Sequence, residues 1–430
     1  MTKTNPQPNA KPHEVIVVGG GLAGLACATR LSKAGKQVTL IEATDRVGGR
    51  VRSDVIDGFT MDHGFQVLLT AYPACQELLD YDALRLRPFE PGALIRNAGR
   101  FTTLGDPWRR PSQALVTMRN PAGSFRDKLL VAKLRSQSRQ GTLDDLYTRD
   151  SVATSDFLAN SGMSSAMVNH FFRPFIGGVF LDESLSVPSR MFEFVFRMFA
   201  QGDVVIPADG MAAIPRQLAD GLPQGTIQFR QTVESVEGTT VHLTNGEILT
   251  AEHLVIATES NAAAKLLGLP ELETQWNETT CVYYSASESP DKRKLLMLSG
   301  DESGPVQTAT VISDIATEYA PKNQSLISVS LSPLGLGSID IDDVPAVDTQ
   351  VRKQLEGWFG NSVQQWRRLG VYRVPYGVPQ TSLDPVIRPV GADIYGGNQD
   401  VYLCGDHMET PSIQGALNSG FRVAKAILDS

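Results

Sequence analysis

The chain has 430 residues, of which 42% are hydrophobic and 20% charged, and its formal net charge is −8. This length predicts more than one domain. The acidic balance argues against a nucleic-acid partner, because such binding rests on clustered Lys and Arg.

The composition also bears on the location of the protein and on metal binding. Residues 1–12 are polar and proline-rich, which predicts a disordered tail without the apolar segment of a secretory signal. The sequence has no run of about 18 apolar residues, so no membrane-spanning helix is predicted. The cysteines have no paired spacing and are expected to be reduced thiols in a cytoplasmic protein, and no metal site is predicted. They are Cys27, Cys75, Cys281 and Cys404.

The first predicted elements are a strand, a glycine turn and a helix. Residues 15–18 are an apolar, β-branched run, and Gly19-x-Gly21-x-x-Gly24 follows at once. In this setting the glycines allow a tight turn, close approach of a pyrophosphate and close packing of the helix. The helix N-terminus then offers N–H groups to the phosphates, with Leu22 and Ala23 as its first positions. The alternative is a glycine-rich turn in an unrelated α/β protein.

A second predicted strand, residues 37–41, ends at Glu42. Glu42 lies 18 residues (42 − 24) after Gly24, close to the roughly 20 expected of the acid that binds a ribose. We therefore predict a dinucleotide site that includes Glu42 and Ala43.

A second glycine pair follows, and Gly49 and Arg50 are predicted to close on the pyrophosphate, with Arg46 as an alternative cation. Residues 15–53 resemble the beginning of the flavin amine oxidase superfamily. That superfamily includes monoamine oxidases, protoporphyrinogen oxidases, carotenoid desaturases and hydroxysqualene dehydroxylases. The resemblance implies FAD, and it implies that a segment passing close to the flavin ring contains Gly64, Phe65, Gln66 and Val67.

The resemblance also implies the fold class, α/β plus α+β: a discontinuous Rossmann-like FAD-binding domain with an inserted substrate domain. The FAD-binding domain is expected at residues 13–89, 201–264 and 385–430. The substrate domain is expected at 90–200 and 265–384. By the same resemblance, Val233 holds the adenine through its backbone.

The last predicted strand ends at Gly405, where a glycine lets the cofactor approach, and Asp406 follows. Asp406 is expected to accept a hydrogen bond from the ribityl chain or to face the pyrophosphate. A final helix opens within residues 411–420, and its N–H groups would stabilise charge on the reduced flavin. By resemblance, Gln414, Gly415 and Ala416 lie beside that edge.

Two histidines, His63 and His407, could attach the flavin covalently or act as a base. A hydrogen-bonded role beside the cofactor is favoured for both, so FAD is expected to be non-covalent. No catalytic residue is nominated.

The middle of the chain is aromatic over residues 171–199. These rings either pack the core of the second domain or line a wide apolar cavity. Residues 115–136 are basic and mostly helical in pattern. The sequence leaves the electron acceptor and the oligomeric state open, and it leaves open a peripheral contact with a membrane surface.

The motifs favour hydride removal from a C–H bond of a large apolar substrate. Residues 412–420 resemble the corresponding stretch of carotenoid desaturases, and the tyrosine of the amine oxidase cage is absent there. Three alternatives stay open: a protoporphyrinogen oxidase, an amine oxidase, and an FAD-binding structural protein without turnover.

Overall fold

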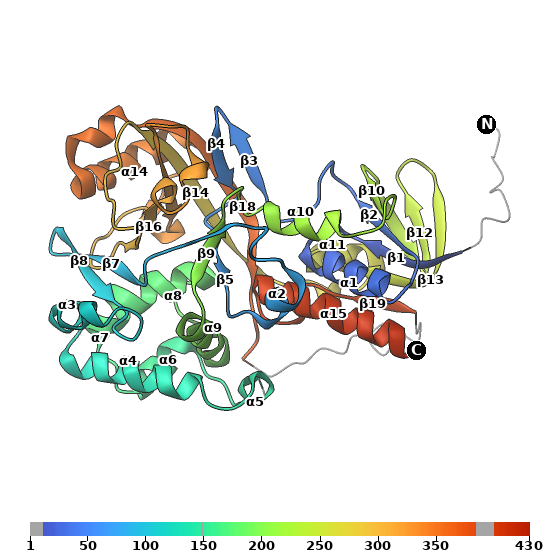
Figure 1. Cartoon of the computed structure of the whole chain (residues 1–430), viewed down its shortest axis with the longest axis horizontal. Coiled ribbons are helices and arrows are strands. Elements are labelled where there is room, and N and C mark those ends of the chain that lie inside the picture. The colour runs from blue at the N-terminus through green and yellow to red at the C-terminus, as the bar shows by residue number, and fades with distance from the viewer. Residues whose placement is uncertain (1–11, 148, 384–399) are drawn as a thin grey trace. The chain divides into compact units, whose positions relative to one another are not determined.

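The computed structural model describes residues 12–147, 149–383 and 400–430 (Figure 1). Contacts divide them into two compact units. Unit 1 contains residues 12–49, Pro215–Thr274 and 400–430, and unit 2 contains Arg50–Ile214 and residues 275–383. The predicted tail lies outside the described residues except for Pro12. Among the described residues, no helix has the length and apolar character to cross a membrane.

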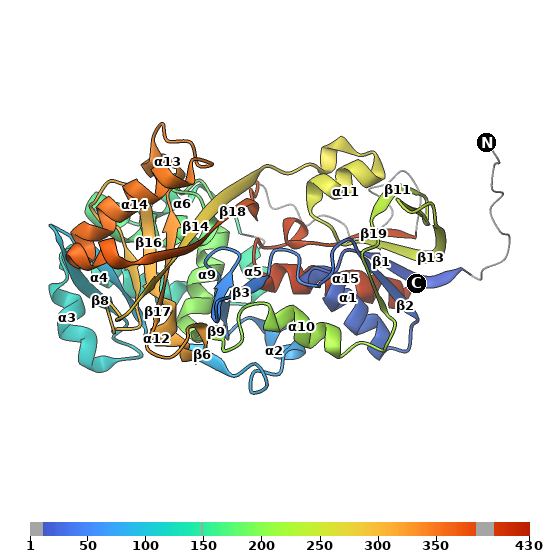
Figure 2. The ribbon, with the colours of Figure 1, turned by 90° about the horizontal axis from the view of Figure 1, so that it is seen from above.

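Unit 1 is built on a sheet with the order β10-β2-β1-β13-β12-β11, and β19 pairs with β13. The strands β10, β2, β1, β13 and β19 run parallel, and β12 pairs antiparallel with β11 and β13. Figure 2 shows α11 on one face of this sheet and α1 and α15 on the other. The elements are β1 (His13–Val18), α1 (Leu22–Lys33), β2 (Val38–Glu42), β10 (Ile227–Phe229), β11 (Val233–Glu237), β12 (Thr240–Leu243), β13 (Ile248–Ile256), α11 (Ser260–Leu267), η3 (Pro270–Leu272), β19 (Val401–Leu403), η7 (Asp406–Met408) and α15 (Ile413–Asp429).

Apolar patterning explains this unit. The strand residues Val15, Ile16 and Val17 are fully buried, as expected of a parallel strand covered on both faces. Helix α1 has small residues on the side that meets α15. A Cβ at Gly420 would collide with the Ala23 carbonyl, so the two helices lie at backbone contact.

Unit 2 contains a second sheet with the order β18-β14-β17-β16-β15-β7-β8, in which only the β15–β7 pair is parallel. A hydrophobic core joins one face of this sheet to α14 through Tyr284, Ile327, Val351 and Trp358. Helix α8 packs on the other face, where Ile95 and Leu298 meet partly buried phenylalanines.

The β elements of unit 2 are β3 (Ser53–Ile56), β4 (Phe59–Asp62), β5 (Leu68–Leu69), β6 (Leu86–Pro88), β7 (Gly92–Asn97), β8 (Arg100–Gly105), β9 (Val204–Pro207), β14 (Trp276–Ala286), β15 (Leu296–Leu298), β16 (Val306–Val311), β17 (Ser325–Leu331) and β18 (Arg367–Pro379).

Its helices are α2 (Pro73–Leu78), η1 (Pro111–Gln113), α3 (Ala114–Arg119), α4 (Phe125–Ser138), α5 (Leu143–Tyr147), α6 (Thr154–Asn160), α7 (Ser165–Met167), η2 (Val168–Phe172), α8 (Arg173–Phe180), α9 (Ser189–Gln201), α12 (Ile312–Ile315), η4 (Thr317–Tyr319), α13 (Pro333–Leu336), α14 (Val344–Phe359) and η5 (Gly360–Gln365). Helix α10 (Ala213–Asp220) crosses the boundary between the units in sequence.

Two features add detail to the sequence-based expectation. The contact grouping assigns residues 50–89 and 201–214 to unit 2, because β5 and β6 both pair with β9 there. The functional division into FAD-binding and substrate domains stays a prediction. The basic segment 115–136 is two helices, α3 and α4, because Pro121 cannot continue a helix and Ser124 with Asp127 forms a capping box that starts α4.

We expect Gly420→Ala to destabilise the protein by about 1–3 kcal/mol, since the added methyl group overpacks the contact between α1 and α15. Thermal unfolding measures the change. Gly357→Ala in α14 is the matched control, because a Cβ there meets nothing within 4 Å, and alanine favours a helix. Equal melting temperatures for the two variants would contradict the packing role of Gly420.

Candidate functional site

The glycine turn of unit 1 has the geometry of a phosphate cradle. Gly19 has a φ of +112°, and a Cβ there would lie 2.8 Å from the Ala257 carbonyl oxygen. A Cβ at Gly24 would collide with the Gly19 carbonyl, whereas a Cβ at Gly21 meets nothing within 4 Å. Gly21 is also the N-cap of α1 and brings no side-chain cap. Open space in front of an uncapped helix N-terminus fits the pyrophosphate of FAD.

The second glycine pair packs on the first. The Gly48 N–H donates to the Gly20 carbonyl at 2.8 Å, and Gly21 and Gly48 form a parallel bridge. Gly49 follows with a φ of +58°, and a Cβ there would lie 3.4 Å from the Gly21 Cα. Two chain segments 28 residues apart (48 − 20) therefore meet at their glycines.

Glu42 is the acid at the end of β2, and its carboxylate is buried. Oε2 accepts the Gly20 N–H at 2.8 Å, and Oε1 accepts the N–H and hydroxyl of Thr44 at 2.8 and 2.7 Å. These bonds fix the carboxylate beside the glycine turn. Thr44 was not singled out from the sequence, although a hydroxyl two residues after an acid is a recognisable turn signal.

The Val233 segment approaches the same place. The Arg230 N–H donates to the Thr44 carbonyl at 2.9 Å, and the Gln231 N–H donates to the Glu42 carbonyl at 3.0 Å. Val233 then begins β11. Unit 1 thus brings Gly19–Gly24, Glu42 and the start of β11 together, while the contact between Val233 and adenine stays a prediction. Ala43 is exposed beside them.

The C-terminal predicted residues lie on β19, η7 and α15 of unit 1. The Gly405 N–H donates to Ser419 Oγ at 3.0 Å, and Asp406 is buried. Ser412 is the N-cap of α15 and accepts the Gly415 N–H at 3.1 Å. This cap uses one of the N–H groups expected to face the flavin. A Cβ at Gly415 would collide with the Thr410 carbonyl, so this glycine is required for packing. The predicted cofactor contacts of Asp406, Gln414 and Ala416 stay predictions.

The remaining predicted residues lie in unit 2. Arg50 Nη1 donates to the Gly377 carbonyl at 3.0 Å, and its guanidinium lies 4.8 Å from the Trp276 ring centroid. These contacts tie Arg50 to β14 and β18, and its role at a pyrophosphate stays a prediction.

The segment expected near the flavin ring is fixed within unit 2. Gln66 Nε2 donates to the carbonyls of Arg50 and His63 at 2.9 and 3.1 Å. His63 Nε2 lies 2.8 Å from an Asp54 carboxylate oxygen. Gly64 has a φ of +87°, Phe65 makes an edge contact with Phe89, and Val67 is partly buried just before β5.

A buried carboxylate that the sequence did not single out stands just before His63. Asp62 Oδ1 accepts the Ser53 hydroxyl at 2.5 Å and the Met211 N–H at 2.9 Å, and Oδ2 accepts the Tyr319 hydroxyl at 3.0 Å. The Tyr283 hydroxyl donates to the Asp62 carbonyl at 2.9 Å. Burial raises the pKa of Asp62 from 3.8 to about 6, although its hydrogen bonds act in the opposite direction.

The aromatic segment divides into two groups. Phe172, Phe180, Phe192 and Phe194 are buried. A second set, Phe171, Phe175, Phe196 and Phe199, keeps part of each ring accessible. Three of the accessible rings form a row, with centroid distances of 5.3 Å for Phe171–Phe175 and 5.1 Å for Phe175–Phe199. Phe196 lies apart from this row, 5.3 Å from the buried ring of Phe192.

The parallel sheet of unit 1 and its glycine cradle are those of a dinucleotide-binding protein. A family model described as "Flavin containing amine oxidoreductase" matches residues 22–428, and the chain belongs to this family. The chain is accordingly of the FAD-dependent oxidoreductase class, and its cofactor is FAD.

Three similar proteins illustrate the range of the family. Polyamine oxidase 5 of Oryza sativa subsp. japonica is 52% identical over 56 residues, which cover 13% of this chain and 11% of that protein. Protoporphyrinogen oxidase 2 of Arabidopsis thaliana is 29% identical over 166 residues, which cover 38% of this chain and 32% of that protein. The matched regions thus span a third or less of these two relatives.

A solved structure of putrescine oxidase bound to putrescine has a TM-score of 0.71 and 18% identity, and covers 98% of this chain and 100% of that one. At this identity the likeness concerns the fold, and it confirms the mixed α/β architecture.

We expect Gly21→Ala to weaken FAD binding about tenfold or more, because the methyl group enters the open space in front of α1, and a tenfold change corresponds to about 1.4 kcal/mol. FAD titration followed by flavin fluorescence measures the dissociation constant. Gly357→Ala is the matched control, since its Cβ also meets nothing within 4 Å. Unchanged FAD affinity in Gly21→Ala would contradict the cradle.

We expect Asp62→Asn to change the pH dependence of stability. A raised folded pKa means that the folded protein keeps this proton up to about pH 6, whereas the unfolded chain releases it near pH 4. The contribution of Asp62 therefore becomes less favourable as pH rises from about 4 to 6, by about 3 kcal/mol in total.

Because Asn keeps an acceptor for Ser53 and Met211 without the charge, the stability of the variant relative to the wild type should rise by up to about 3 kcal/mol over that window. Urea unfolding at pH 4.5 and pH 7 measures the difference. A relative stability that is the same at both pH values would disprove the buried charge.

Proposed function

We propose that this flavoenzyme oxidises a C–H bond of a large apolar substrate, as a desaturase of isoprenoids does. A hydride equivalent leaves one carbon, a proton leaves its neighbour, and a C=C bond forms between them. Bound FAD supplies the two-electron acceptor. The residues of the chain then have two tasks, which are to bind the substrate and to orient it.

The row of partly accessible phenylalanines on η2, α8 and α9 carries this proposal. Phe171 and Phe175 pack on the sheet face that includes Ala93, Ile95 and Leu298. The rings offer flat apolar area without hydrogen-bonding groups, which suits a substrate recognised by shape. A small charged substrate would gain little from such a wall.

His63 is one histidine that could accept the proton of the substrate as a base. Its Nε2 is engaged with Asp54, and its ring lies 4.7 Å from that of Tyr372. This pairing supports a structural role for His63. The proposal needs no protein base, because solvent accepts the departing proton.

A protoporphyrinogen oxidase is the second candidate, because the same phenylalanine row suits a tetrapyrrole and the similarity to protoporphyrinogen oxidase 2 extends over 38% of this chain. An amine oxidase is the third, supported by the match to polyamine oxidase 5. Residues 411–416 lack the tyrosine that the amine oxidase cage uses.

Three substrates offered to the oxidised protein without oxygen distinguish these candidates. We expect a long isoprenoid polyene to bleach the flavin absorbance, and neither a reduced tetrapyrrole nor a diamine to do so. Bleaching by the tetrapyrrole alone would establish the second candidate, and bleaching by the diamine alone the third.

A pair of substitutions tests whether the phenylalanine row contacts the substrate. We expect Phe175→Leu to lower kcat/KM for the polyene about tenfold, because part of the flat contact area is lost. Phe359→Leu is the matched control, since Phe359 packs against the core on the other face of the same sheet. Equal losses in both variants would show a general packing effect and contradict the wall.

A further inference from the structure

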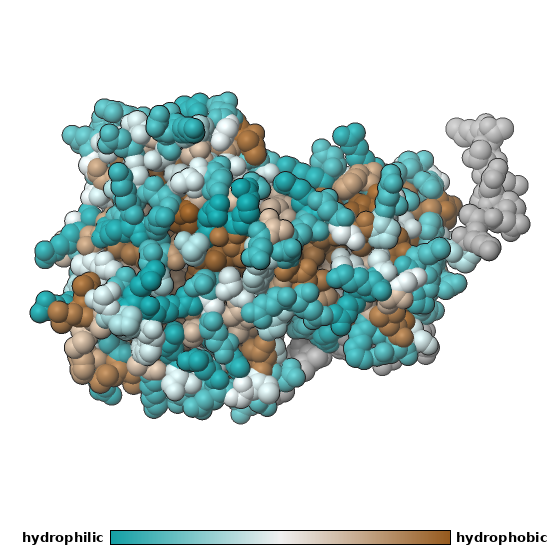
Figure 3. All heavy atoms as spheres, in the orientation of Figure 1, coloured by the Kyte–Doolittle hydropathy of each residue, from teal (hydrophilic) through white to brown (hydrophobic). Residues whose placement is uncertain are grey.

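The exposed apolar side chains of unit 2 are concentrated in one short region. Between residues 108 and 129 six large apolar side chains are at least half exposed: Trp108, Leu115, Val116, Met118, Phe125 and Leu129. We call this set the α3–α4 patch. Figure 3 shows hydrophobic atoms gathered at the corner where Figure 1 places α3 and the adjoining part of α4. An exposed apolar patch of this kind marks an interaction surface.

Hydrogen bonds hold the parts of the α3–α4 patch together. Lys128 Nζ donates to the carbonyls of Met118, Asn120 and Gly123, at 2.9, 2.6 and 3.1 Å, so the end of α3 is fixed against the first turns of α4. The Arg135 guanidinium lies 4.9 Å from the Trp108 ring centroid, which places Trp108 beside α4.

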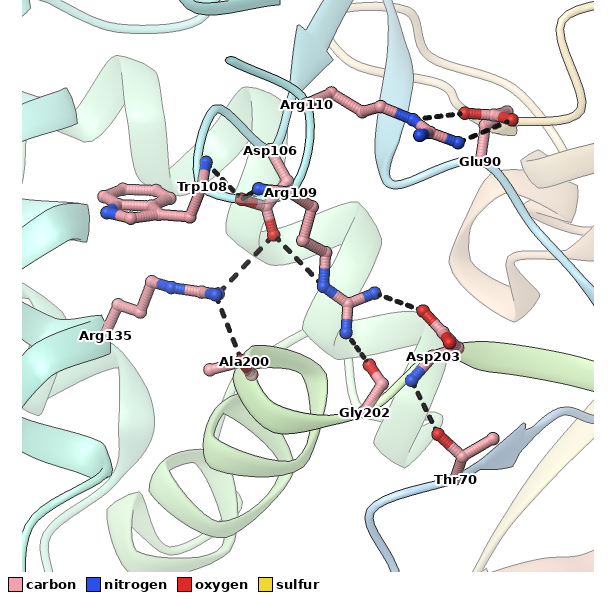
Figure 4. A network of polar contacts seen from close by, with 10 residues as sticks. All are labelled: Thr70, Glu90, Asp106, Trp108, Arg109, Arg110, Arg135, Ala200, Gly202 and Asp203. Atoms are coloured by element: carbon pink, nitrogen blue, oxygen red, sulfur yellow. Dashed lines mark hydrogen bonds and ion pairs between the residues drawn. The ribbon is translucent and has the colours of Figure 1, made fainter.

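The loop that carries Trp108 is also fixed (Figure 4). Asp106 Oδ1 accepts the Trp108 N–H at 3.0 Å, and its other oxygen lies 3.5 Å from Arg135. Arg109 bonds Asp203 at 2.9 Å, and Arg110 pairs with Glu90 at 3.2 Å. The patch is therefore a fixed surface, and its side chains remain exposed although the backbone beneath them is well bonded.

The charge around the patch has the opposite sign to that of the whole chain. Residues 108–139 contain eight basic residues and one acidic residue, Asp127, whereas the chain carries −8. Asp127 is buried and caps α4. The exposed cations Arg119, Arg126, Lys133 and Arg139 form no ion pair within the described part of the chain.

Helical spacing places these cations beside the apolar side chains. Phe125 and Leu129 are four residues apart, and Arg126 and Lys133 lie three residues before and four residues after Leu129. Residues three and four apart share a helix face, so α4 presents two apolar side chains flanked by two cations. On α3, Leu115, Met118 and Arg119 have the same relation.

We propose that the α3–α4 patch docks this protein on an anionic lipid bilayer as a peripheral, reversible contact. The tryptophan and aliphatic side chains would enter the interface between headgroups and acyl chains, and the cations would pair with lipid phosphates. A protein partner would not require this excess of unpaired cations around the apolar side chains. The contact is independent of the chemistry proposed above, since none of the six side chains of the patch belongs to the phenylalanine row.

Flotation of the FAD-loaded protein with vesicles tests the proposal. We expect binding to phosphatidylcholine vesicles that contain about 30 mol% of the anionic lipid phosphatidylglycerol. Binding to phosphatidylcholine alone should be at least tenfold weaker. Raising the salt concentration should weaken the binding, because exposed charges are screened. Binding that ignores lipid charge, or an absence of binding to both vesicles, would overturn the proposal.

Two pairs of variants assign the binding to the patch. The double variant Phe125→Ser with Leu129→Ser should lose at least tenfold in vesicle affinity, whereas Leu334→Ser should not, although Leu334 is 78% exposed in the same unit. Arg126→Glu with Lys133→Glu should abolish the preference for anionic vesicles, and Lys353→Glu on α14 is its control. All variants should retain bound FAD, as measured by the ratio of flavin to protein absorbance.

Sedimentation velocity without lipid tests whether a second copy of the chain, rather than a bilayer, covers the patch. If the wild type forms a dimer that Phe125→Ser with Leu129→Ser dissociates, and vesicles do not compete with the dimer, the surface is a contact between two copies of the chain. That result would also overturn the lipid proposal.

Discussion

The backbone contacts of α1 are the constraint on which unit 1 depends. A Cβ at Gly24 would collide with the Gly19 carbonyl, and a Cβ at Gly420 would collide with the Ala23 carbonyl. Helix α1 is therefore held against the glycine turn on one side and against α15 on the other. This position aims its uncapped N-terminus at the open space in front of Gly21. The hydrogen bond from Gly20 to Glu42 then joins the phosphate end of the cradle to the ribose end.

Local patterns were readable from the sequence. The strand, glycine turn and helix at residues 15–33 combine a short periodicity with a turn signal, and the strand ending at Glu42 has the same kind of pattern. The hydrogen bonds within these elements join residues that are close in sequence, and the spacing from Gly24 to Glu42 is that of a dinucleotide-binding motif. The break between α3 and α4 had an equally local cause in Pro121, and the helical pattern on both sides concealed it.

The partners of Asp62 could not be predicted in this way. Tyr283 and Tyr319 stand 221 and 257 positions away in the chain, and nothing in their neighbourhoods indicates a shared carboxylate. The same holds for Phe171 to Phe199, because helical spacing shows which rings share a face and does not show what covers that face. Burial alone separated Phe172 and Phe192 from the accessible rings. Long-range contacts decide both cases, whereas local propensity decided the glycine turn.

The way β19 and α15 complete unit 1 has a consequence for biosynthesis. The parallel sheet takes β1 from the beginning of the chain and β19 from residues 401–403, and α15 covers α1 only after residue 413. The N-terminus of a nascent chain leaves the ribosome first, and contacts between residues this distant in sequence form late. Until the last segment emerges, β1 and α1 therefore have exposed apolar and glycine-rich backbone without their final neighbours. The nucleotide cradle therefore gains its supporting helix only after residues 413–429 have been synthesised.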